Sequence, residues 1–287
     1  MTGQEVPRSR GDLCPGVLRP WPADDGGLVR LRLIGGQVTT GRLAALAAVS
    51  AHFGDGDVHT TARANLQVRG LPVADGELPG DVVDALLATG LVPHPSHELV
   101  RNVMVSPLSG LTGGVADLRP VAAAYDELLC ADPALASLPG RFLVVLDDGR
   151  GDVQGRTLDL GAMAVDETAA QLRAGSTGWG EVVRLTDVPG RLVELAHAFV
   201  DARGDGPTAP WHVDELDVPL LDGDRDPRTL RNSGPLPYGP FGGGLHVEVP
   251  GGVLGPGLLG SFVDDEPEDR VLVVTGWNGI VTPDATA

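Results

Sequence analysis

One pattern occurs twice in this chain of 287 residues, once near each end, and it restricts the fold more than any other feature of the sequence. Residues 27–36 and residues 244–252 both read as a short strand that ends in a pair of glycines, with one residue fewer in the second copy. Each copy continues with apolar residues at helical spacing and then a strand, at 58–61 and at 271–275. Because a pair of such units forms a shared crevice, the sequence predicts two half-domains related by a pseudo-twofold axis, with a ligand site between them.

The first copy also predicts the local structure of its half-domain. Residues 28–33 alternate apolar and basic side chains, as in a strand with one buried face, and residues 41–53 place apolar side chains at helical spacing. Residues 58–70 predict a strand, a loop and a second strand, and residues 80–89 predict an amphipathic helix that ends at Gly90. These elements form a βαββα unit, so the expected fold class is α+β, with helices covering one face of each sheet.

Composition and patterning divide the rest of the chain. We expect an N-terminal region with the first half-domain over 1–100, a mixed α/β segment over 101–203, an acidic linker over 204–235 and the second half-domain over 236–287. Inside the middle segment the patterns predict strands near 141–146, 157–160 and 181–185, with a turn at 147–149, and helices at 168–173 and 188–200.

The charge of the chain excludes several classes of partner. The formal charge is −18 at pH 7, which disfavours nucleic-acid phosphate and anionic membranes as partners.

No apolar stretch is long enough to cross a bilayer and the first ten residues are polar, so we expect a cytoplasmic protein. All 21 basic residues are arginine, whose planar guanidinium suits bidentate binding of carboxylates.

Two stretches contain side chains of metal-binding type without the spacing of a metal site. His94 and His97 lie in a proline-containing loop with no evident third ligand, and the acidic residues of 214–226 lack the ligand order of a calcium loop. Cys14 and Cys130 are the only cysteines and read as reduced thiols. We therefore expect no metal bound by protein ligands.

Polar side chains occupy every second position through the region 63–69, namely Arg63, Asn65, Gln67 and Arg69. They could be the solvated face of an edge strand, with no further role. Alternatively, the duplication places them beside the crevice between the two copies, where they would contact a ligand.

Several stretches, taken in chain order, carry a family resemblance. They are residues 10–16 around Cys14, the strand–helix–strand unit of 27–61, and residues 61–70, 101–110 and 138–149. Together they resemble precorrin-3B synthases, which belong to the nitrite and sulfite reductase superfamily. That resemblance implies paired ferredoxin-like half-domains, a siroheme or related tetrapyrrole beside a 4Fe-4S cluster, and basic side chains that hold the tetrapyrrole carboxylates.

The resemblance also implies a set of cofactor-binding residues and no particular catalytic residue. Arg63, Arg69, Arg101 and Arg141 would pair with tetrapyrrole carboxylates, Asn65 and Gln67 would orient the ring edge, and Asn102 belongs to the same set. Two positions depart from the family pattern. Leu143 stands where sulfite reductases have a second lysine, and Asn278 stands where precorrin-3B synthases tend to have an arginine after the tryptophan.

The cysteine content leaves the function open between three alternatives. Cluster-bearing relatives use four cysteines that follow the second half-domain, whereas this sequence has two separated cysteines and ends at residue 287. The first alternative is an oxidoreductase that oxidises a corrin precursor or reduces a small oxyanion, with a cluster-bearing or electron-donor protein as partner. The second is a non-catalytic tetrapyrrole carrier or subunit, and the third is a structural relic that binds nothing.

Overall fold

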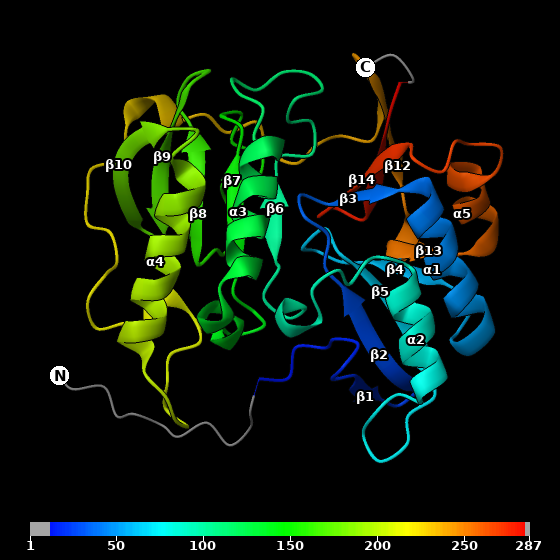
Figure 1. The fold of residues 1–287 in the computed structure, drawn as a ribbon. Coiled ribbons are helices and arrows are strands. Elements are labelled where there is room, and N and C mark those ends of the chain that lie inside the picture. Colours follow the sequence, from blue (N-terminus) through cyan, green and yellow to red (C-terminus); the bar gives the residue numbers. More distant parts are fainter. Residues whose placement is uncertain (1–11, 285–287) are drawn as a thin grey trace.

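The computed structural model describes residues 12–284, which form three five-stranded sheets and five α-helices (Figure 1). Two of the sheets belong to the duplicated halves, and the third lies beside them in the middle segment of the chain. The α+β class and the pair of half-domains predicted from the sequence are confirmed. Five short 3-10 turns complete the structure: η1 Pro95–His97, η2 Pro133–Ser137, η3 Val213–Glu215, η4 Pro227–Thr229 and η5 Pro250–Gly252.

The first sheet is antiparallel and is covered on one face by two helices, α1 (Thr40–Phe53) and α2 (Gly80–Ala88). Helix α1 begins where the side-chain oxygen of Thr39 accepts a hydrogen bond from the backbone N of Arg42, 3.3 Å away. Side chains along the strands of this sheet alternate between its two faces, as predicted. Leu31 and Leu66 enter the core beneath the helices, while their neighbours point to the open face. In spatial order the strands are β1 (Trp21–Ala23), β2 (Gly26–Leu31), β5 (Leu66–Leu71), β4 (Val58–Thr60) and β13 (Val253–Leu254).

The sheet of the second half has the same strand order as the first. Its helix, α5 (Pro256–Val263), packs beside α1, and the residues beneath α1, α2 and α5 form one continuous core. In spatial order its strands are β11 (Gly239–Phe241), β12 (Gly244–Glu248), β15 (Gly279–Pro283), β14 (Val271–Thr275) and β3 (Gln37–Thr39).

Each half-domain contributes one strand to the sheet of the other half-domain. Strand β13 comes from the C-terminal copy and pairs with β4 of the first sheet, while β3 comes from the N-terminal copy and pairs with β14. Both lent strands follow the glycine pairs noticed in the sequence, at Gly35–Gly36 and Gly251–Gly252. The exchange makes the pseudo-twofold relation visible as an identical strand order in the two sheets.

The middle sheet is mixed, with parallel strands at one side and antiparallel strands at the other. Helices α3 (Arg119–Ala131) and α4 (Val188–Arg203) cover one face (Figure 1). Strand β6 also bridges to the first half-domain through Ile34 and Val103. In spatial order the strands are β10 (Gly178–Arg184), β9 (Ala169–Ala174), β8 (Leu160–Ala164), β7 (Val144–Asp147) and β6 (Val103–Val105).

The helix predicted over 168–173 is wrong, because this segment is strand β9. Its two alanines and its Gln-Leu-Arg sequence have high helix propensity, which favoured the helical interpretation. Pairing with β8 on one side and β10 on the other satisfies the backbone along this buried strand. Tertiary pairing therefore overrides the local preference.

The acidic segment 204–235 runs around the β10 edge of the middle sheet, with residues 213–221 against the helix-covered core and residues 224–226 at the open face. Gln171 donates from Nε2 to the carbonyl oxygen of Asp224 at 2.8 Å and accepts from the backbone N of Asp226 at 2.8 Å. The ring centroid of Trp179 lies 4.7 Å from the guanidinium carbons of both Arg173 and Arg225. Cation–π contacts with Trp179 therefore hold the segment at Arg225.

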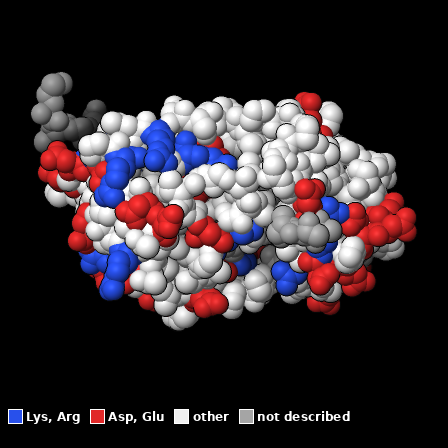
Figure 2. Space-filling model, turned by 90° about the horizontal axis from the view of Figure 1, so that it is seen from above, with Lys and Arg blue, Asp and Glu red and all other residues white. Residues whose placement is uncertain are grey.

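Charge is unevenly distributed over the surface. Figure 2 shows acidic side chains gathered at the end of the molecule formed by α5 and the loop that leads to β14. The acidic residues of this loop are Asp264, Asp265, Glu266, Glu268 and Asp269. Within residues 12–284 no helix has both the length and the apolar character needed to cross a membrane.

Candidate functional site

The three sheets meet at two equivalent loops, one from each half-domain. The loop between β4 and β5 contributes Ala64 and the loop between β14 and β15 contributes Trp277, and both pack on the open face of the middle sheet. Ala64 and Asn278 have φ values of 56° and 54°, which L-residues rarely adopt, so both loops carry a tight turn at this junction. The apolar residues that join the three sheets are Ala64, Met104, Leu143, Val145, Val153, Leu158 and Trp277.

Arg156, from the connection between β7 and β8, ties the two loops together. Its Nη1 donates to the carbonyl oxygen of Ala62 at 3.1 Å and its Nη2 to that of Gly276 at 3.0 Å. Its guanidinium carbon also lies 5.4 Å from the ring centroid of Trp277. One cation from the middle segment therefore sets the distance between the duplicated loops.

A row of polar side chains crosses the open face of the first sheet. Arg30, Gln67 and His59 are direct cross-strand partners on β2, β5 and β4. Arg30 donates to Oε1 of Gln67 from Nε at 3.2 Å and from Nη2 at 2.9 Å. Burial lowers the pKa of the Arg30 guanidinium, and the charge of Arg63 lowers it further. Arg30, held by its hydrogen bonds to Gln67, thus forms a cationic group with Arg63.

Arg63 and Arg141 form the centre of this group. Nη1 of Arg63 donates to the backbone carbonyl oxygen of Arg141 at 2.8 Å, which places the two residues together although 78 positions separate them. Burial lowers the pKa of Arg63, and the charge of Arg141 contributes in the same direction. Within residues 12–284 the side chain of Arg141 has no hydrogen bond or ion pair, so its guanidinium is available to a ligand.

Asn65 and Asn102 lie behind the arginines, where they hold the backbone in place. Oδ1 of Asn65 accepts from the backbone N of Leu33 at 2.9 Å, and its Nδ2 donates to Oδ1 of Asn102 at 3.4 Å. Nδ2 of Asn102 in turn donates to the carbonyl oxygen of Gly140 at 2.9 Å. Both side chains are buried, so they join β2, β6 and the Arg141 segment and do not reach the open face.

Arg32 supports the same segment from the first sheet. It donates from Nε to Asn102 at 3.1 Å and from Nη1 to the carbonyl oxygen of Pro15 at 3.1 Å. Burial, and then the charge of Arg30, lower the pKa of Arg32 to about 10. Sequence reasoning missed Arg30 and Arg32 as site residues. The signal was their alternation in residues 28–33, which puts both on the open face once β2 is paired with β5.

Two arginines of the sequence-predicted set are engaged elsewhere. Arg101 forms a bidentate ion pair with Asp126 of α3, with both N–O distances 2.7 Å, on the helix-covered side of the middle sheet. Arg69 donates from Nε to Asp25 at 2.9 Å near the surface. The structure therefore brings Arg63, Gln67 and Arg141 together with Arg30, places Asn65 and Asn102 behind them, and leaves Arg69 and Arg101 with acidic partners.

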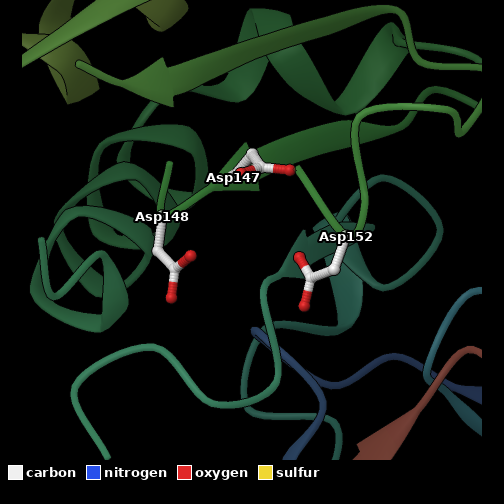
Figure 3. Close-up of side chains that lie close together, drawn as sticks. All are labelled: Asp147, Asp148 and Asp152. Carbon is white, nitrogen blue, oxygen red and sulfur yellow. The ribbon is translucent and has the colours of Figure 1, made fainter. Parts of the chain in front are cut away.

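A second candidate lies at the end of β7, where Asp147, Asp148 and Asp152 form a buried acidic cluster (Figure 3). Each side chain offers one carboxylate oxygen, and these oxygens all lie within 4.8 Å of one another. The sequence indicated only a turn here, because the signal of three aspartates in six residues does not show that all three are buried.

Comparison with known proteins found one family model and several curated relatives to which parts of the chain are similar. Residues 22–77 match the model of the Nitrite/Sulfite reductase ferredoxin-like half domain. A precorrin-3B synthase of Sinorhizobium is 33% identical over 177 residues, which are 60% of this chain and 34% of that protein. A ferredoxin–nitrite reductase of Leptolyngbya laminosa is 29% identical over 126 residues, 42% of this chain and 24% of that protein. The matches thus cover about a third or less of these curated relatives.

The fold is shared with a solved structure. NirA of Mycobacterium tuberculosis superimposes with a TM-score of 0.67 and 17% sequence identity, and the match covers 97% of this chain and 58% of that one. At this identity the likeness concerns the arrangement of the half-domains and the middle sheet. It supports the α+β architecture described above.

Proposed function

We propose, from the premise that residues 22–77 are a nitrite/sulfite reductase ferredoxin-like half domain, that this protein binds a polycarboxylate tetrapyrrole where its three sheets meet. The observation that carries the proposal is the group of Arg30, Arg63 and Arg141. In a chain of formal charge −18, these guanidiniums lie together, and no carboxylate among residues 12–284 is hydrogen-bonded to any of them. Such a group attracts a ligand that carries several carboxylates.

The donor set fits the side groups of a siroheme or precorrin. Arg141 would take one carboxylate through its free guanidinium, and Arg63 would take another through the nitrogens that do not bind the Arg141 carbonyl. Arg30 would face a third from the other side of Gln67, and each charge-assisted hydrogen bond contributes about 1.5–3 kcal/mol. Arg156 and Trp277 would hold the two loops at the spacing that the macrocycle requires.

The protein's residues bind and orient, and a bound tetrapyrrole would supply the redox chemistry. We propose an oxidoreductase that acts in the cytoplasm, either on a corrin precursor, like a precorrin-3B synthase of cobalamin biosynthesis, or on a small oxyanion, like a nitrite or sulfite reductase. A 4Fe-4S cluster does not fit the cysteines of this sequence. Cys14 lies against Gly140, whereas Sγ of Cys130 contacts Asp126 within α3, so the two thiols belong to different parts of the molecule.

The test is a binding titration of the purified full chain with siroheme, followed by the absorbance of the macrocycle. Arg141→Ala should weaken binding at least tenfold, and Arg63→Ala should do so to a similar degree. Arg184→Ala is the matched control, because Arg184 is a surface arginine on β10 whose partner is Asp187. Equal affinity of the Arg141 variant and the unchanged protein would count decisively against the proposal.

A second candidate function is a non-catalytic tetrapyrrole carrier, or a subunit completed by a cluster-bearing or electron-donor protein. The observation that favours it is the cysteine content, since two separated thiols cannot hold a four-cysteine cluster. Iron and acid-labile sulfide measured on purified protein separate the alternatives. A tetrapyrrole band without sulfide favours the carrier or subunit, and a band with sulfide favours an enzyme that acquires its cluster with a partner.

A further inference from the structure

The loop that follows β7 concentrates three buried carboxylates. Asp147 is the last residue of β7, and the chain turns back so that Asp148 and Asp152 face each other beside it (Figure 3). Asp147 and Asp148 are 2% and 0% exposed, and the side chain of Asp152 is also 2% exposed. Buried carboxylates are uncommon unless a cation or several hydrogen bonds compensate them.

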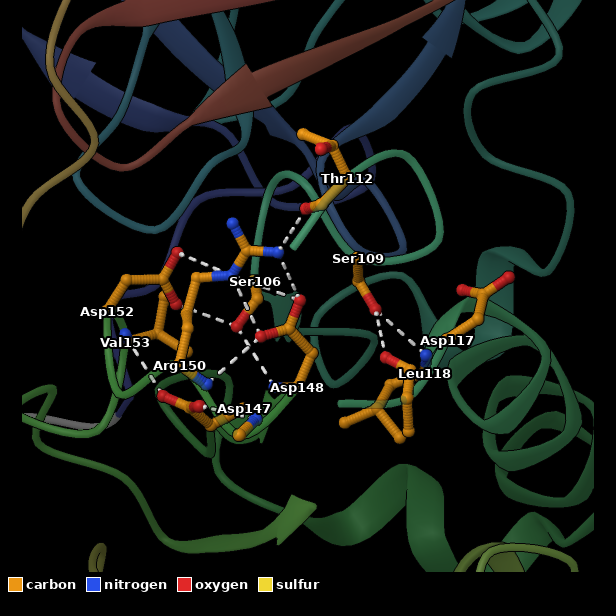
Figure 4. Close-up of polar contacts among 12 residues, drawn as sticks. Ser106, Ser109, Thr112, Asp117, Leu118, Asp147, Asp148, Arg150, Asp152 and Val153 are labelled. Carbon is orange, nitrogen blue, oxygen red and sulfur yellow. Dashed lines mark hydrogen bonds and ion pairs between the residues drawn. The ribbon is translucent and has the colours of Figure 1, made fainter. Parts of the chain in front are cut away.

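Hydrogen bonds account for Asp147 completely. Its Oδ1 accepts from the backbone N atoms of Gly149 and Gly151 at 3.0 and 2.8 Å, and its Oδ2 accepts from that of Val153 at 3.2 Å (Figure 4). These bonds fold the loop around the carboxylate. Oδ1 thus accepts two hydrogen bonds and Oδ2 accepts one, which leaves one lone pair of Oδ2 free.

Asp148 has a cation of its own. Arg150 donates to it from Nε at 2.9 Å and from Nη2 at 2.6 Å, while Nη2 also donates to the carbonyl oxygen of Thr112 at 2.7 Å. The guanidinium of Arg150 therefore neutralises Asp148. Its Nε is 3.9 Å from Oδ2 of Asp152, which is too long for a hydrogen bond.

Asp152 is the least compensated of the three carboxylates. Its Oδ1 accepts a hydrogen bond from Oγ of Ser106 at 2.7 Å, but its Oδ2 is buried and has no hydrogen-bond partner in the described part of the chain. Burial, together with the charges of Asp147 and Asp148, raises the pKa of Asp152 to about 7, although the Ser106 hydrogen bond and the charge of Arg150 act in the opposite direction. An orphaned buried oxygen that faces two other carboxylates is the arrangement a cation would complete.

We propose that Asp147, Asp148 and Asp152 bind one hard divalent cation of the Mg²⁺ or Ca²⁺ class. Carboxylate oxygens are the ligands these ions prefer, and one oxygen from each residue already lies within the spacing of a single ion. Arg150 is then the competing cation, because it holds Asp148 as long as no ion does. The proposal is independent of the tetrapyrrole site.

A cavity beside the cluster gives Arg150 room to move and the ion a way in. Its volume is about 290 Å³, and its walls include Arg150, Asp152, the Gly113–Gly114 turn and residues 233–237. Ser233 donates from its backbone N to the carbonyl oxygen of Arg150 at 3.1 Å. Binding of an ion would consequently stiffen both the loop after β7 and the end of segment 204–235.

The experiment uses the full chain freed of metals with a chelator, then titrated with CaCl₂ or MgCl₂ at pH 8 and followed by calorimetry and by the melting temperature. We expect saturable binding of one ion and a rise in melting temperature. Asp152→Asn should weaken binding at least tenfold. Asp226→Asn is the control, because Asp226 pairs with Arg228 at the surface and should leave binding unchanged.

Arg150→Gln separates an ion site from a permanent internal ion pair. If Arg150 competes with the ion, this variant should bind the ion about tenfold more tightly and regain with CaCl₂ the melting temperature that it loses in chelator. Absence of any cation response in the unchanged protein would overturn the proposal. So would equal binding by the unchanged protein and Asp152→Asn.

Discussion

At the scale of single residues, the four arginines predicted as site residues differ in their availability because they face different neighbours. Arg63 and Arg141 meet each other through a backbone carbonyl, whereas Arg69 and Arg101 meet Asp25 and Asp126. An arginine already held by a carboxylate must give up that partner before it can bind a ligand. The availability of a guanidinium is therefore decided by the face on which it stands.

Arg101 should matter for stability. Arg101→Ala leaves Asp126 largely buried without its cation, and we expect a loss of about 3–5 kcal/mol in the free energy of unfolding. Denaturant unfolding measures the change. Arg69→Ala is the matched comparison and should cost less than about 1 kcal/mol, because that pair is near the surface. Similar losses in both variants would contradict the assignment.

His246 should make stability fall in acid. It is 1% exposed, its Nδ1 donates to the carbonyl oxygen of Pro237 and its Nε2 lies 3.1 Å from Oγ1 of Thr275. Burial lowers the pKa of His246 in the folded state, so below about pH 6.5 the unfolded chain binds a proton that the folded protein resists. Stability should therefore decrease as the pH falls from 7 to 5.

The measurement is the free energy of unfolding of the unchanged protein and of His246→Gln across that pH range. The glutamine variant should show a flatter profile, because the glutamine amide does not titrate. An identical slope in both proteins would assign the acid sensitivity to other groups.

At the scale of elements, the exchanged strands β3 and β13 depend on the turns that precede them. Gly36 has a φ of 74°, and a Cβ there would overlap the carbonyl oxygen of Val274 on the neighbouring strand β14. Gly251 in the second copy has a φ of 62°, but a Cβ there would meet no atom within 4 Å. Both glycines have a positive φ, which favours glycine, but only at Gly36 would an added Cβ meet another atom.

Alanine at these two positions should separate strain from steric overlap. Gly251→Ala should cost about 1 kcal/mol for the left-handed backbone alone, whereas Gly36→Ala should cost at least 2 kcal/mol more because β3 must move away from β14. Thermal and denaturant unfolding of the two variants test this. Equal costs would mean that the close approach at Gly36 is relieved without loss of pairing.

At the scale of the whole molecule, neither half-domain is complete without the other. Residues 12–100 lack β13, and residues 236–287 lack β3, so each fragment would expose an unpaired sheet edge and part of the core shared beneath α1, α2 and α5. Exchange of strands thus converts two small units into one cooperative structure.

Fragments should reveal this dependence. We expect residues 12–100 expressed alone to show no cooperative thermal transition by circular dichroism. Co-expression of residues 12–100 with 101–284 should restore a folded complex that copurifies. A sharp transition of the isolated first fragment, close to that of the intact chain, would show that the lent strand contributes little.

Local patterns predicted a large part of the fold. Periodicity was sufficient for α1, α2 and α4, and the recurring glycine pair was sufficient to predict the duplicated halves, because both are properties of neighbouring residues. The exchange of β3 and β13 could not be predicted, since strands of three and two residues carry almost no pattern of their own. The strand β9 was mistaken for a helix for a related reason, as its pairing partners are distant in sequence.

The candidate site was predictable to a similar extent. Arg63, Gln67 and Arg141 were found from the sequence and do lie together, whereas Arg30 joined them only when the register of β2 and β5 was known. The acidic cluster of Asp147, Asp148 and Asp152 was visible as residues but not as a buried group. Burial depends on what the loop packs against, and the packing partners come from other parts of the chain.

By itself the sequence determined that this protein is built from two similar α+β halves and that every cationic side chain is a guanidinium. Those properties follow from the order of residues and from short-range periodicity. Only the tertiary structure decided which arginines keep a free guanidinium and which are held by aspartates. The reason is that an ion pair forms between groups brought together by sheet register and helix packing, and neither can be read from the neighbours of a residue in the chain.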